Sequence, residues 1–526
     1  MQEERPLEVL LSSSQPIDLV GSPTNVLVTG HAVTGRDAGW AVPIVLRIAS
    51  TVGVRGIAGQ LSSDMTLDAE VLRTAADLGG YDQGELSGVS LAGGRLAYLA
   101  SDAASAMPLD VDSAWLDDTL LARRGAPLAA LGATWRGFSQ VEAATDGSVI
   151  VVGKVEDAAT QGLLDVVVRW PGEDVLYVEG QSVSGLGTPG GRLTTRVHTS
   201  PNGSQWTAPI DSASGGALLL NGAVLEFDGG GRAITGTSIP PGTGVPGGSV
   251  WGTFSNAPVN DAGDVAFVEA LFSSQESHLA TLRNRRVVAV PVLASGTPLV
   301  GMDRDGVLLR YDFATSSPFV EGATLLPPGF QIDVDRDGAA DTGWSRAAGL
   351  PLLRGPNADG ALVFESYLID PSGMLTTAVL LAPSLRIDQS VCEGVPHSKG
   401  YPARLAASGD TAADSKDLVL NVYDLPRISF GFMLMSKTSG LVVQPGGSQG
   451  TLCLGGSIGR LNRQVFSTFL TTIATVRVDT EAVPQPMANA AIVAGETWYA
   501  QAWFRDTVPG TGPTSNFSSA IAVTFD

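Results

Sequence analysis

Residues 256–270 read NAPVNDAGDVAFVEA, a polar turn followed by an apolar run. Asp and Asn side chains hydrogen-bond the backbone of a turn, and Gly263 supplies the positive φ that a tight turn requires. The run after the glycine is apolar at consecutive positions, which is typical of a strand covered on both faces. The stretch therefore predicts one tight turn and one fully buried strand.

The same pattern recurs along the first three-quarters of the chain. The copies carry their glycines at Gly39, Gly94, Gly147, Gly216, Gly263, Gly306 and Gly360. Successive glycines lie 55, 53, 69, 47, 43 and 54 residues apart. These spacings fit propeller blades of four strands with loops of variable length. The pattern predicts an all-β protein with a β-propeller of about seven blades, and the weaker copies at Gly94 and Gly216 leave six or eight open.

Hairpin-like runs follow several copies. Residues 120–132, 166–180 and 279–292 each read as strand, polar turn and strand, as the middle and outer strands of a blade would. Residues 6–16, PLEVLLSSSQP, resemble only the second half of such a hairpin, and the last copy lacks that half. An N-terminal strand that completes the last blade would close the ring and remove its exposed edges. We therefore expect the propeller to span residues 1–385.

The repeat is absent from Cys392 onward. Seven strand-like runs follow, with turn signals about every 10–15 residues, so residues 386–526 predict an immunoglobulin-like or related β-sandwich. The run WYAQAWF indicates either a central strand or an exposed aromatic patch, and burial in a core is favoured because large aromatic side chains bury much area. Its two faces carry Trp498, Ala500, Ala502 and Phe504 on one side and Tyr499, Gln501 and Trp503 on the other.

The composition limits the class of protein. Of 526 residues, 44% are hydrophobic and only 16% charged, with 64 Gly and 31 Pro, which favours many short strands and turns. The net charge of −21 argues against a nucleic-acid partner. No apolar run approaches the roughly 18 residues that cross a membrane. The start, MQEERPLEV, lacks the pattern of a signal peptide, so either the protein is cytoplasmic or a signal peptide has been removed.

The two cysteines, Cys392 and Cys453, both lie in the last quarter of the chain. Their wide separation resembles neither a zinc site nor a redox CxxC motif. A disulfide within the C-terminal domain, formed in an oxidising compartment, is the favoured interpretation. Two unpaired, buried thiols are the alternative.

Residues 333–341, DVDRDGAAD, match the front half of an EF-hand-type calcium loop. Carboxylates at alternate positions can surround one hard cation, and the glycine at the sixth position permits a sharp turn. Position 12 is Trp344, so the usual bidentate glutamate is missing. The loop predicts a calcium site, and a solvated acidic loop is the alternative. The predicted ligands are Asp333, Asp335, Asp337, Asp341 and the backbone oxygen of Ala339.

No fingerprint of a nucleophilic, nucleotide-binding or zinc enzyme occurs, and the four histidines lie far apart in the sequence, so no catalytic residue is predicted. A long segment before Gly216 carries Arg196, His198 and Trp206. It would either decorate a binding face or form a plain loop between blades.

Two resemblances rest on quoted residues. The motif Asn260-x-x-Gly263-x-x-Ala266-Phe267 resembles the tandem repeat of secreted bacterial propeller-like proteins. That resemblance implies export and attachment to the cell surface, with no catalytic residues to carry over.

The segments CEGVPHSKGYPARLAASG, PGGSQGTLCLGGSIGRL and GETWYAQAWFRD resemble a C-terminal module of exported proteins from environmental bacteria. This second resemblance implies export and a Cys392–Cys453 bridge, but no activity. Such a bridge would close a loop of about 60 residues and contribute about 3–4 kcal/mol in the chain-entropy treatment.

Together these features predict a secreted or cell-surface protein that is non-enzymatic and acts in binding, adhesion or extracellular assembly. Its expected partner is a protein or polysaccharide at a propeller face, or further copies of itself. One alternative is an extracellular polysaccharide hydrolase or lyase whose paired carboxylates come from several blades. Another is a structural subunit of an extracellular filament or coat.

Overall fold

A computed structural model of the chain describes residues 86–100, 111–270, 362–382 and 388–526 with short gaps, and mainly isolated strands elsewhere. The gaps are 214, 228–229, 240–249, 399–401, 410, 414–417, 427, 469–473 and 509–511. Within residues 7–85 and 277–353 it describes the strands and the segment 341–346.

The chain divides into two compact units. Glu4–Phe319 and Leu326–Pro383 form one, here called the repeat unit. Ser384–Asp526, with Met1–Glu3 and Val320–Leu325, form the other, here called the C-terminal unit.

The described residues form strands and two 3₁₀ turns, η2 (Ala129–Leu131) and η3 (Pro445–Gly447), so the predicted all-β class is confirmed. Within this described part, no helix is long and apolar enough to span a bilayer.

The described strands of the repeat unit form seven sheets, six of them built from consecutive stretches of chain. The strand pairs are antiparallel, except that β1 (Leu7–Ser12) pairs with β30 (Ile332–Asp333) in parallel in the sheet that joins the two ends. The first contains β2 (Ile17–Asp18), β3 (Pro23–Val28), β4 (Val33–Thr34), β5 (Trp40–Arg47), β6 (Val54–Ala58) and β7 (Val71–Thr74). The second contains β8 (Leu86–Ala92), β9 (Arg95–Ala100), β10 (Ser113–Leu116) and β11 (Thr119–Arg123). The third contains β12 (Pro127–Leu128), β13 (Ala133–Ala143), β14 (Val149–Glu156), β15 (Leu163–Trp170) and β16 (Asp174–Val178).

The next three sheets continue the same order along the chain. The fourth contains β17 (Gly190–Leu193), β18 (His198–Thr199), β19 (Trp206–Ser212), β20 (Ala217–Leu220) and β21 (Ala223–Val224). The fifth contains β22 (Phe254–Ser255), β23 (Val265–Ala270), β24 (Ser277–Arg283) and β25 (Arg286–Pro291). The sixth contains β26 (Leu299–Met302), β27 (Leu308–Asp312) and β28 (Ser317–Val320).

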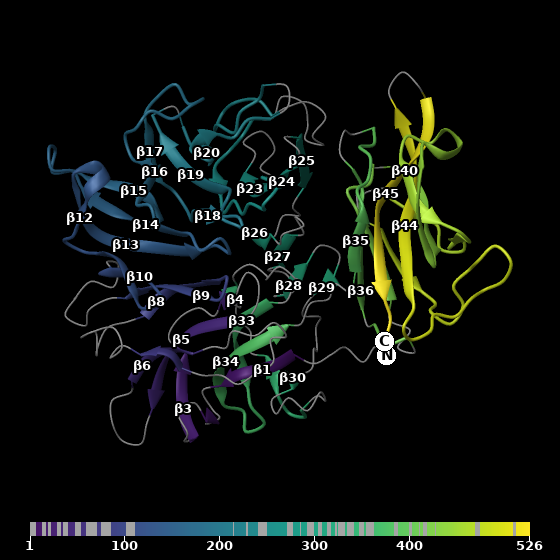
Figure 1. Cartoon of the computed structure of the whole chain (residues 1–526), viewed down its shortest axis with the longest axis horizontal. Helices are drawn as coiled ribbons and strands as arrows, with labels where there is room; N and C mark the ends of the chain where they lie inside the picture. Colours follow the sequence, from purple (N-terminus) through teal and green to yellow (C-terminus); the bar gives the residue numbers. More distant parts are fainter. Residues whose placement is uncertain are drawn as a thin grey trace. The chain divides into compact units, whose positions relative to one another are not determined.

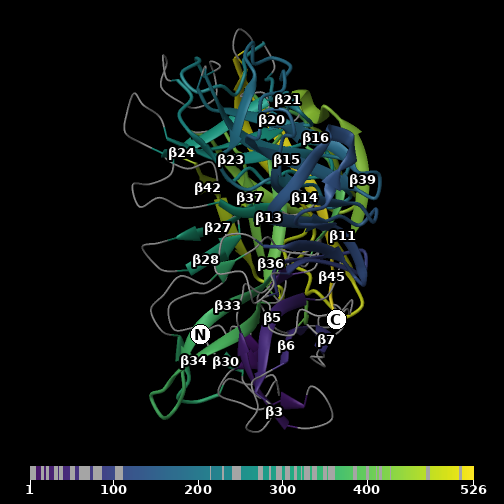
Figure 2. The ribbon, with the colours of Figure 1, turned by 90° about the vertical axis from the view of Figure 1, so that its left-hand side faces the viewer.

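The seventh sheet joins the two ends of the repeat unit. It contains β31 (Ser345–Arg346), β32 (Leu352–Leu353), β33 (Leu362–Ile369), β34 (Leu375–Ala382), β1 (Leu7–Ser12) and β30 (Ile332–Asp333). The N-terminal strand β1 pairs antiparallel with β34, with Glu8 opposite Leu381 and Ser12 opposite Ala378. Figures 1 and 2 both show β30, β33 and β34 side by side.

Figure 1 shows the sheets following one another around a common centre, from β3 through β8, β14 and β20 to β27. Seven consecutive sheets, with the first strand of the chain added to the last sheet, form a propeller-like arrangement because this addition closes the ring.

Six of the seven repeat glycines stand at equivalent places. Gly39, Gly94, Gly147, Gly263, Gly306 and Gly360 each lie just before the second main strand of a sheet, namely β5, β9, β14, β23, β27 and β33. The prediction that Gly216 is a repeat glycine is wrong, because Gly216 precedes β20, which is the third strand of its sheet. The equivalent glycine is Gly203, before β19.

Gly203 shares its geometry with Gly147 and Gly263. All three have φ between 77° and 84°. Each donates its backbone N–H to the carbonyl three residues earlier, at 3.0–3.1 Å, which closes the same tight turn. With Gly203 in place of Gly216, the intervals that follow Gly94 become 53, 56 and 60 residues, more even than the 53, 69 and 47 counted from the sequence pattern.

These turns also bind one another across neighbouring sheets. The backbone N–H of Thr145, in the turn of the third sheet, donates to the carbonyl of Pro201 in the next turn at 2.8 Å. The backbone N–H of Asn202 then donates to the Asp261 carboxylate in the following turn at 2.8 Å. The repeated motif therefore closes a local turn and also aligns adjacent sheets.

The strand after the turn at Gly147 is buried on both faces because a neighbouring sheet covers each side. In β14, Val149, Val151 and Val155 pack toward the second sheet, in one core with Trp135. The alternate residues Ile150 and Val152 pack toward the fourth sheet. The expectation of a strand that is apolar on both faces is thus confirmed for β14.

Two of the three predicted hairpins are confirmed. Residues 166–180 contain the β15–β16 hairpin and residues 279–292 the β24–β25 hairpin. The prediction for residues 120–132 is wrong, because β11 pairs with β10 whereas β12 pairs with β13 of the next sheet. This stretch is the crossing from one sheet to the next, which has the same local pattern as a hairpin.

The C-terminal unit contains two sheets and a separate hairpin. One sheet has the order β35 (Asp388–Cys392), β45 (Gly512–Thr524), β44 (Thr497–Val508), β38 (Phe430–Ser436) and β41 (Gly459–Arg460), with β42 (Phe466–Ser467) also on β38. The other has the order β36 (Arg404–Gly409), β37 (Leu418–Tyr423) and β43 (Ala474–Val478). The hairpin consists of β39 (Thr438–Val443) and β40 (Thr451–Gly455).

The strand β44 is covered on both faces. Trp498, Ala500, Ala502 and Phe504 lie in the core that both sheets share. The opposite face carries fully buried Gln501 and half-buried Tyr499 and Trp503, which pack with Leu434 and Leu454 below the β39–β40 hairpin. The favoured interpretation of this run as a core strand is confirmed for the first face.

Cys392 and Cys453 form a disulfide with their Cα atoms 6.5 Å apart, so the alternative of two free thiols is excluded. The bond joins the end of β35 to β40 of the hairpin. Gln501 holds the same hairpin from below, because its side chain accepts from the Cys453 N–H at 2.9 Å and donates to the carbonyls of Thr451 and Ser518 at 3.0 and 2.8 Å.

Candidate functional site

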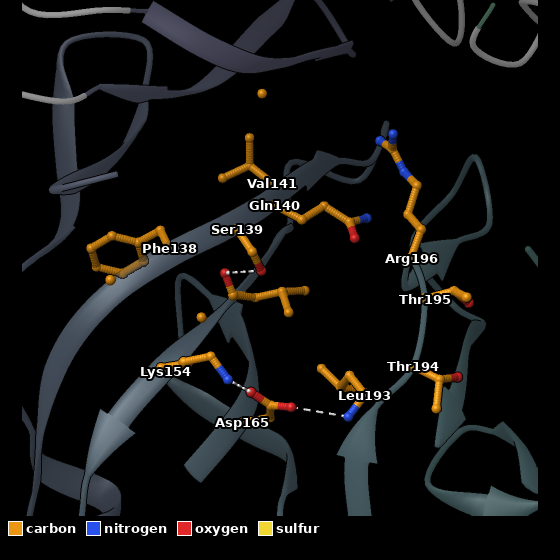
Figure 3. A pocket seen from close by; sticks show the side chains of 14 residues that line it. Phe138, Ser139, Gln140, Val141, Lys154, Asp165, Leu193, Thr194, Thr195 and Arg196 are labelled. Atoms are coloured by element: carbon orange, nitrogen blue, oxygen red, sulfur yellow. Dashed lines mark hydrogen bonds and ion pairs between the residues drawn. The ribbon is translucent and has the colours of Figure 1, made fainter. Parts of the chain in front are cut away.

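A cavity of about 470 Å³ opens between the third and fourth sheets of the repeat unit (Figure 3). It is lined by Gly88 of β8, Gly137–Val141 of β13, Val152–Lys154 of β14, Asp165 of β15 and the segment Leu193–Arg196. Because both sheets contribute walls, the cavity depends on their side-by-side packing.

One wall carries a paired carboxylate. Asp165 has a mostly buried side chain, and its Oδ1 lies 2.6 Å from the Nζ of Lys154 on the neighbouring strand. Its Oδ2 accepts the backbone N–H of Leu193 from the fourth sheet at 3.0 Å (Figure 3). The carboxylate therefore joins the two sheets while its charge is balanced by a half-exposed lysine.

A second carboxylate, Glu142, lies at the other end of the same inter-sheet boundary. Its Oε1 lies 2.9 Å from Nε of Arg196, and its Oε2 accepts the Thr199 N–H at 3.1 Å. Gln140 accepts the Val197 N–H at 3.1 Å and donates back to the Val197 carbonyl. The polar groups of β13 thus hold β18 of the fourth sheet and the residue before it.

Tyr177 completes the boundary behind the cavity and donates its hydroxyl proton to the Gly191 carbonyl. Burial raises the pKa of Tyr177 far above its ordinary value, and the nearby carboxylates of Glu179, Asp211 and Asp165 raise it further. The phenol therefore stays neutral and acts as a donor at physiological pH.

The groups that face the opening are mainly donors and cations. Thr194 and Thr195 are exposed, the Lys154 side chain is half-exposed, and Arg196 is about one-third exposed. Each carboxylate in the cavity region already accepts from protein donors, so this arrangement is better suited to holding a polar ligand than to transferring its protons.

Arg196, His198 and Trp206, expected in an insertion, belong instead to the regular fourth sheet. Trp206 begins β19 and is buried. His198 lies in β18, with Nε2 2.5 Å from Oδ1 of Asn256 and Nδ1 4.0 Å from Glu142. Of the three, only Arg196 reaches the cavity, and His198 connects successive sheets.

The predicted calcium loop lies largely outside the described residues. Asp333 is the last residue of β30, but nothing is described of its side chain, nor of Asp335, Asp337 or Ala339. Asp341 is described, and its backbone N–H donates to the Ile332 carbonyl at 2.8 Å. Calcium binding by this loop stays a prediction. In the part of the chain that is described, no three metal-ligating side chains come together.

Lys154 and Asp165 were not singled out from the sequence, although a signal exists. Each is a charged residue within a mostly apolar strand, VIVVGKVE and LLDVVVRW respectively. Their positions pair directly across β14 and β15. Opposite charges at facing positions of two successive, mostly apolar runs indicate a cross-strand ion pair, because a carboxylate as buried as Asp165 needs a partner.

No protein-family model matches this sequence, and no relative is found among characterised proteins. Distant likenesses to β-propeller domains of solved structures exist. The β-propeller domain of the Trilobed protease from Pyrococcus furiosus is 11% identical, with a TM-score of 0.34 over 68% of this chain and 95% of that chain. TolB from Acinetobacter baumannii is 10% identical, with a TM-score of 0.26 over 69% of this chain and 79% of that chain.

A third likeness is to prolyl oligopeptidase B from Galerina marginata, which is 11% identical with a TM-score of 0.35. It covers 76% of this chain but only 55% of that chain. These likenesses are too distant to bear on activity, and the propeller-like description of the repeat unit rests on its own strand order.

Proposed function

We propose that the protein is a secreted or cell-surface binding protein without enzymatic activity, and that the inter-sheet cavity holds a polar, hydroxyl-rich ligand such as a polysaccharide segment. The observation that carries this proposal is the pairing of Asp165 and Glu142 with protein donors, while Lys154, Thr194 and Thr195 are among the residues that line the cavity. Hydroxyl and ammonium donors on a rigid wall match the acceptors of a sugar chain.

Extracellular location is part of the proposal. The Cys392–Cys453 disulfide supports it, since such bonds persist in oxidising compartments. The partial match of Asn260–Phe267 to the repeat of secreted bacterial propeller-like proteins agrees with it.

We further infer a seven-bladed propeller and an immunoglobulin-like sandwich. The sheet order β36-β37-β43 facing β35-β45-β44-β38-β41 supports the second assignment. In that comparison β37, β38, β43, β44 and β45 take the places of strands B, C, E, F and G.

Binding of the full chain to a panel of neutral and acidic polysaccharides tests the function. Thr195→Trp places a bulky ring at the opening and should weaken binding roughly tenfold or more. Thr119→Trp, at another exposed strand position, should leave binding unchanged. New reducing ends or unsaturated sugars after incubation would instead favour the hydrolase or lyase alternative. Absence of binding to every polysaccharide, or equal binding by Thr195→Trp, would overturn the proposed ligand class.

Calcium binding by Asp333–Asp341 is a separate proposal, supported by the spacing of its carboxylates. Calcium should raise the unfolding temperature of the full chain relative to chelator, because a ligand that binds only the folded state stabilises it. Asp335→Asn should remove that increase. Equal unfolding temperatures in calcium and chelator would contradict the site.

A further inference from the structure

The outer face of the C-terminal unit carries a group of exposed apolar side chains around one arginine. This group, here called the aromatic patch, consists of Ile428, Phe430, Phe432, Val465, Trp503 and Arg505. Phe432 stands opposite Trp503 across β38 and β44. Val465 lies just before β42, which pairs with β38 on its other side. The patch therefore spans three adjacent strands of one sheet.

The rings and the arginine contact one another. Phe432 and Trp503 are stacked, with ring centroids 4.9 Å apart and planes inclined by 28°. Phe430 meets Trp503 edge-to-face, with centroids 6.4 Å apart. The Arg505 guanidinium carbon lies 5.4 Å from the Trp503 ring centre and 5.9 Å from that of Phe430. These cation–π contacts hold the guanidinium in place while its in-plane N–H groups stay available.

The aromatic patch is partly buried at one end and exposed to solvent at the other. Phe432 and Trp503 pack against buried Leu434, Leu454 and Phe517 at the end of the face that the β39–β40 hairpin covers. Beyond the hairpin, Phe430 is 48% exposed and Val465 56% exposed. Apolar area of this kind, next to a rigid covered core, is typical of a protein-binding surface.

Ile428 strengthens this interpretation. It is 81% exposed and has a φ of 57°. A β-branched residue rarely adopts that conformation, because it strains the backbone. In solvent the apolar side chain also makes no contact that would offset this strain. A contact made by Ile428 in a complex would account for both features.

Arg505 identifies the chemistry of the partner. Among the described residues its guanidinium makes no ion pair, and it lies against the rings of Phe430 and Trp503. A fixed, exposed guanidinium binds a carboxylate through two parallel hydrogen bonds. Because Arg505 covers the Trp503 ring, this ring is not a free platform for a sugar, and an acidic protein surface is the better match.

The repeat unit is the acidic part of the chain. Residues 1–383 contain 42 Asp and Glu but only 22 Lys and Arg, whereas residues 384–526 contain 11 and 10. Almost the whole net charge of −21 therefore belongs to the repeat unit. We propose that the aromatic patch of one copy binds the acidic repeat unit of a second copy.

This contact joins two different surfaces, so each copy keeps one free patch and one free acidic surface after pairing. Heterologous contacts of this kind produce closed rings or open chains. The inference is independent of the cavity and its ligand. It concerns assembly, and either proposal can fail without the other.

Sedimentation velocity of the full chain over increasing concentration, at about 50 and about 500 mM NaCl, tests the proposal. Species larger than a monomer should form as the concentration rises. Because each copy carries a charge of −21, copies repel one another most at low salt, so the contribution of Arg505 is measured as the difference between the wild type and Arg505→Glu at each salt concentration. Arg505→Glu and Phe430→Ser should each weaken association roughly tenfold or more. Val493→Ser, at a 56% exposed position away from the patch, should not. A chain that stays monomeric at both salt concentrations, or variants that associate like the wild type, would overturn the proposal.

A photo-crosslinking residue in place of Phe430 then identifies the contacted surface. Crosslinks between copies should reach peptides from residues 4–383. Crosslinks only to peptides from residues 384–526 would show a contact between two C-terminal units and overturn the proposed partner surface. Circular dichroism of each variant checks that loss of association does not follow from loss of the fold.

Discussion

In the repeat unit, neighbouring sheets meet through copies of one glycine turn, and the contact from Thr145 to Pro201 is followed by one from Asn202 to Asp261. In the C-terminal unit, a single hairpin is fastened to its sheet by one disulfide and one buried glutamine. The first strategy distributes stability over many similar contacts, whereas the second relies on two strong links besides ordinary hydrogen bonds such as that from Ser436 Oγ to a carbonyl of β40. Single substitutions should therefore damage the C-terminal unit more than the repeat unit.

Removal of the disulfide should have the largest effect. The sequence separation of 61 residues between Cys392 and Cys453 corresponds to about 4 kcal/mol of unfolding free energy in the chain-entropy treatment. The double variant Cys392→Ser, Cys453→Ser should lose about this amount in the C-terminal unit. Hydrogen exchange in denaturant, followed peptide by peptide, reports each unit separately.

The repeat unit is the internal control for this variant because both cysteines of the chain lie outside it. Peptides from β13, β14 and β15 should keep their protection. An equal loss in those peptides would contradict the separation of the two units.

Gln501→Leu should have the second largest effect, about 3 kcal/mol. The change leaves the Cys453 N–H and the carbonyls of Thr451 and Ser518 without their partner in a buried place, and each such loss costs about 1–3 kcal/mol. Chemical unfolding of the C-terminal unit measures the loss. Gln464→Leu, at an exposed position, should change stability by less than about 0.5 kcal/mol. Equal effects of the two variants would show that Gln501 does not fasten the hairpin.

A smaller effect, about 2–3 kcal/mol, is expected for Gly203→Ala in the repeat unit. A Cβ at this position would lie 2.7 Å from Oγ of Ser148 and 2.8 Å from the Asp146 carboxylate in the neighbouring turn. Gly94→Ala is the matched control, because Gly94 has a similar positive φ but open space around the added atom. It should lose about 1 kcal/mol from the backbone conformation alone.

The difference between the two alanine variants measures the contribution of the contact between turns. Thermal or chemical unfolding of the repeat unit provides it. Equal losses would indicate that the motif acts only within its own turn, and would weaken the contrast between the two units.

The repeat was predictable from sequence because a glycine turn and the strand after it are local features. The error at Gly216 has a physical cause. In SASGGALLL a glycine precedes an apolar run. The third strand of a sheet gives this pattern as well as the strand after a repeat turn, because neighbouring sheets cover both. The true copy, SPNGSQWTAPI, places Gln205 and Thr207 in the first positions after its turn. Thr207 is nevertheless buried, because its hydroxyl donates to the Ala257 carbonyl of the next sheet. A local sequence pattern does not indicate a hydrogen-bond partner that lies on another sheet.

The same limit applies to both candidate binding surfaces. The face of WYAQAWF that carries Trp503 could be derived from alternation, but its cover by the β39–β40 hairpin depends on a strand that the sequence pattern did not indicate. The cavity required the third and fourth sheets to be placed side by side, which sequence spacing does not provide. Asp165 becomes informative only once Lys154 and Leu193 are known to face it.

The smallest expected effect is a loss of stability of the C-terminal unit at acidic pH, caused by Glu496. Burial raises the pKa of Glu496, but hydrogen bonds from Lys437, Trp498 and the Val493 N–H outweigh burial and hold it below the ordinary value of 4.5. A carboxyl with a depressed pKa in the folded state contributes stability above its unfolded pKa and loses that contribution as pH falls through the folded value. The C-terminal unit should therefore lose up to about 1 kcal/mol from this group below pH 4.5.

Glu496→Gln should remove this part of the pH dependence, since the amide does not titrate and still accepts from the Trp498 indole. The variant should be less stable than the wild type at pH 7 and approach it as the pH falls through the depressed pKa. Unfolding of the C-terminal unit at a series of pH values measures both curves, and Glu481→Gln, at an exposed position, is the matched control. Parallel curves for the wild type and Glu496→Gln would mean that the Lys437 contact contributes nothing. The disulfide and Gln501 would then be the main local links beyond the core of the C-terminal unit, which would sharpen its contrast with the distributed contacts of the repeat unit.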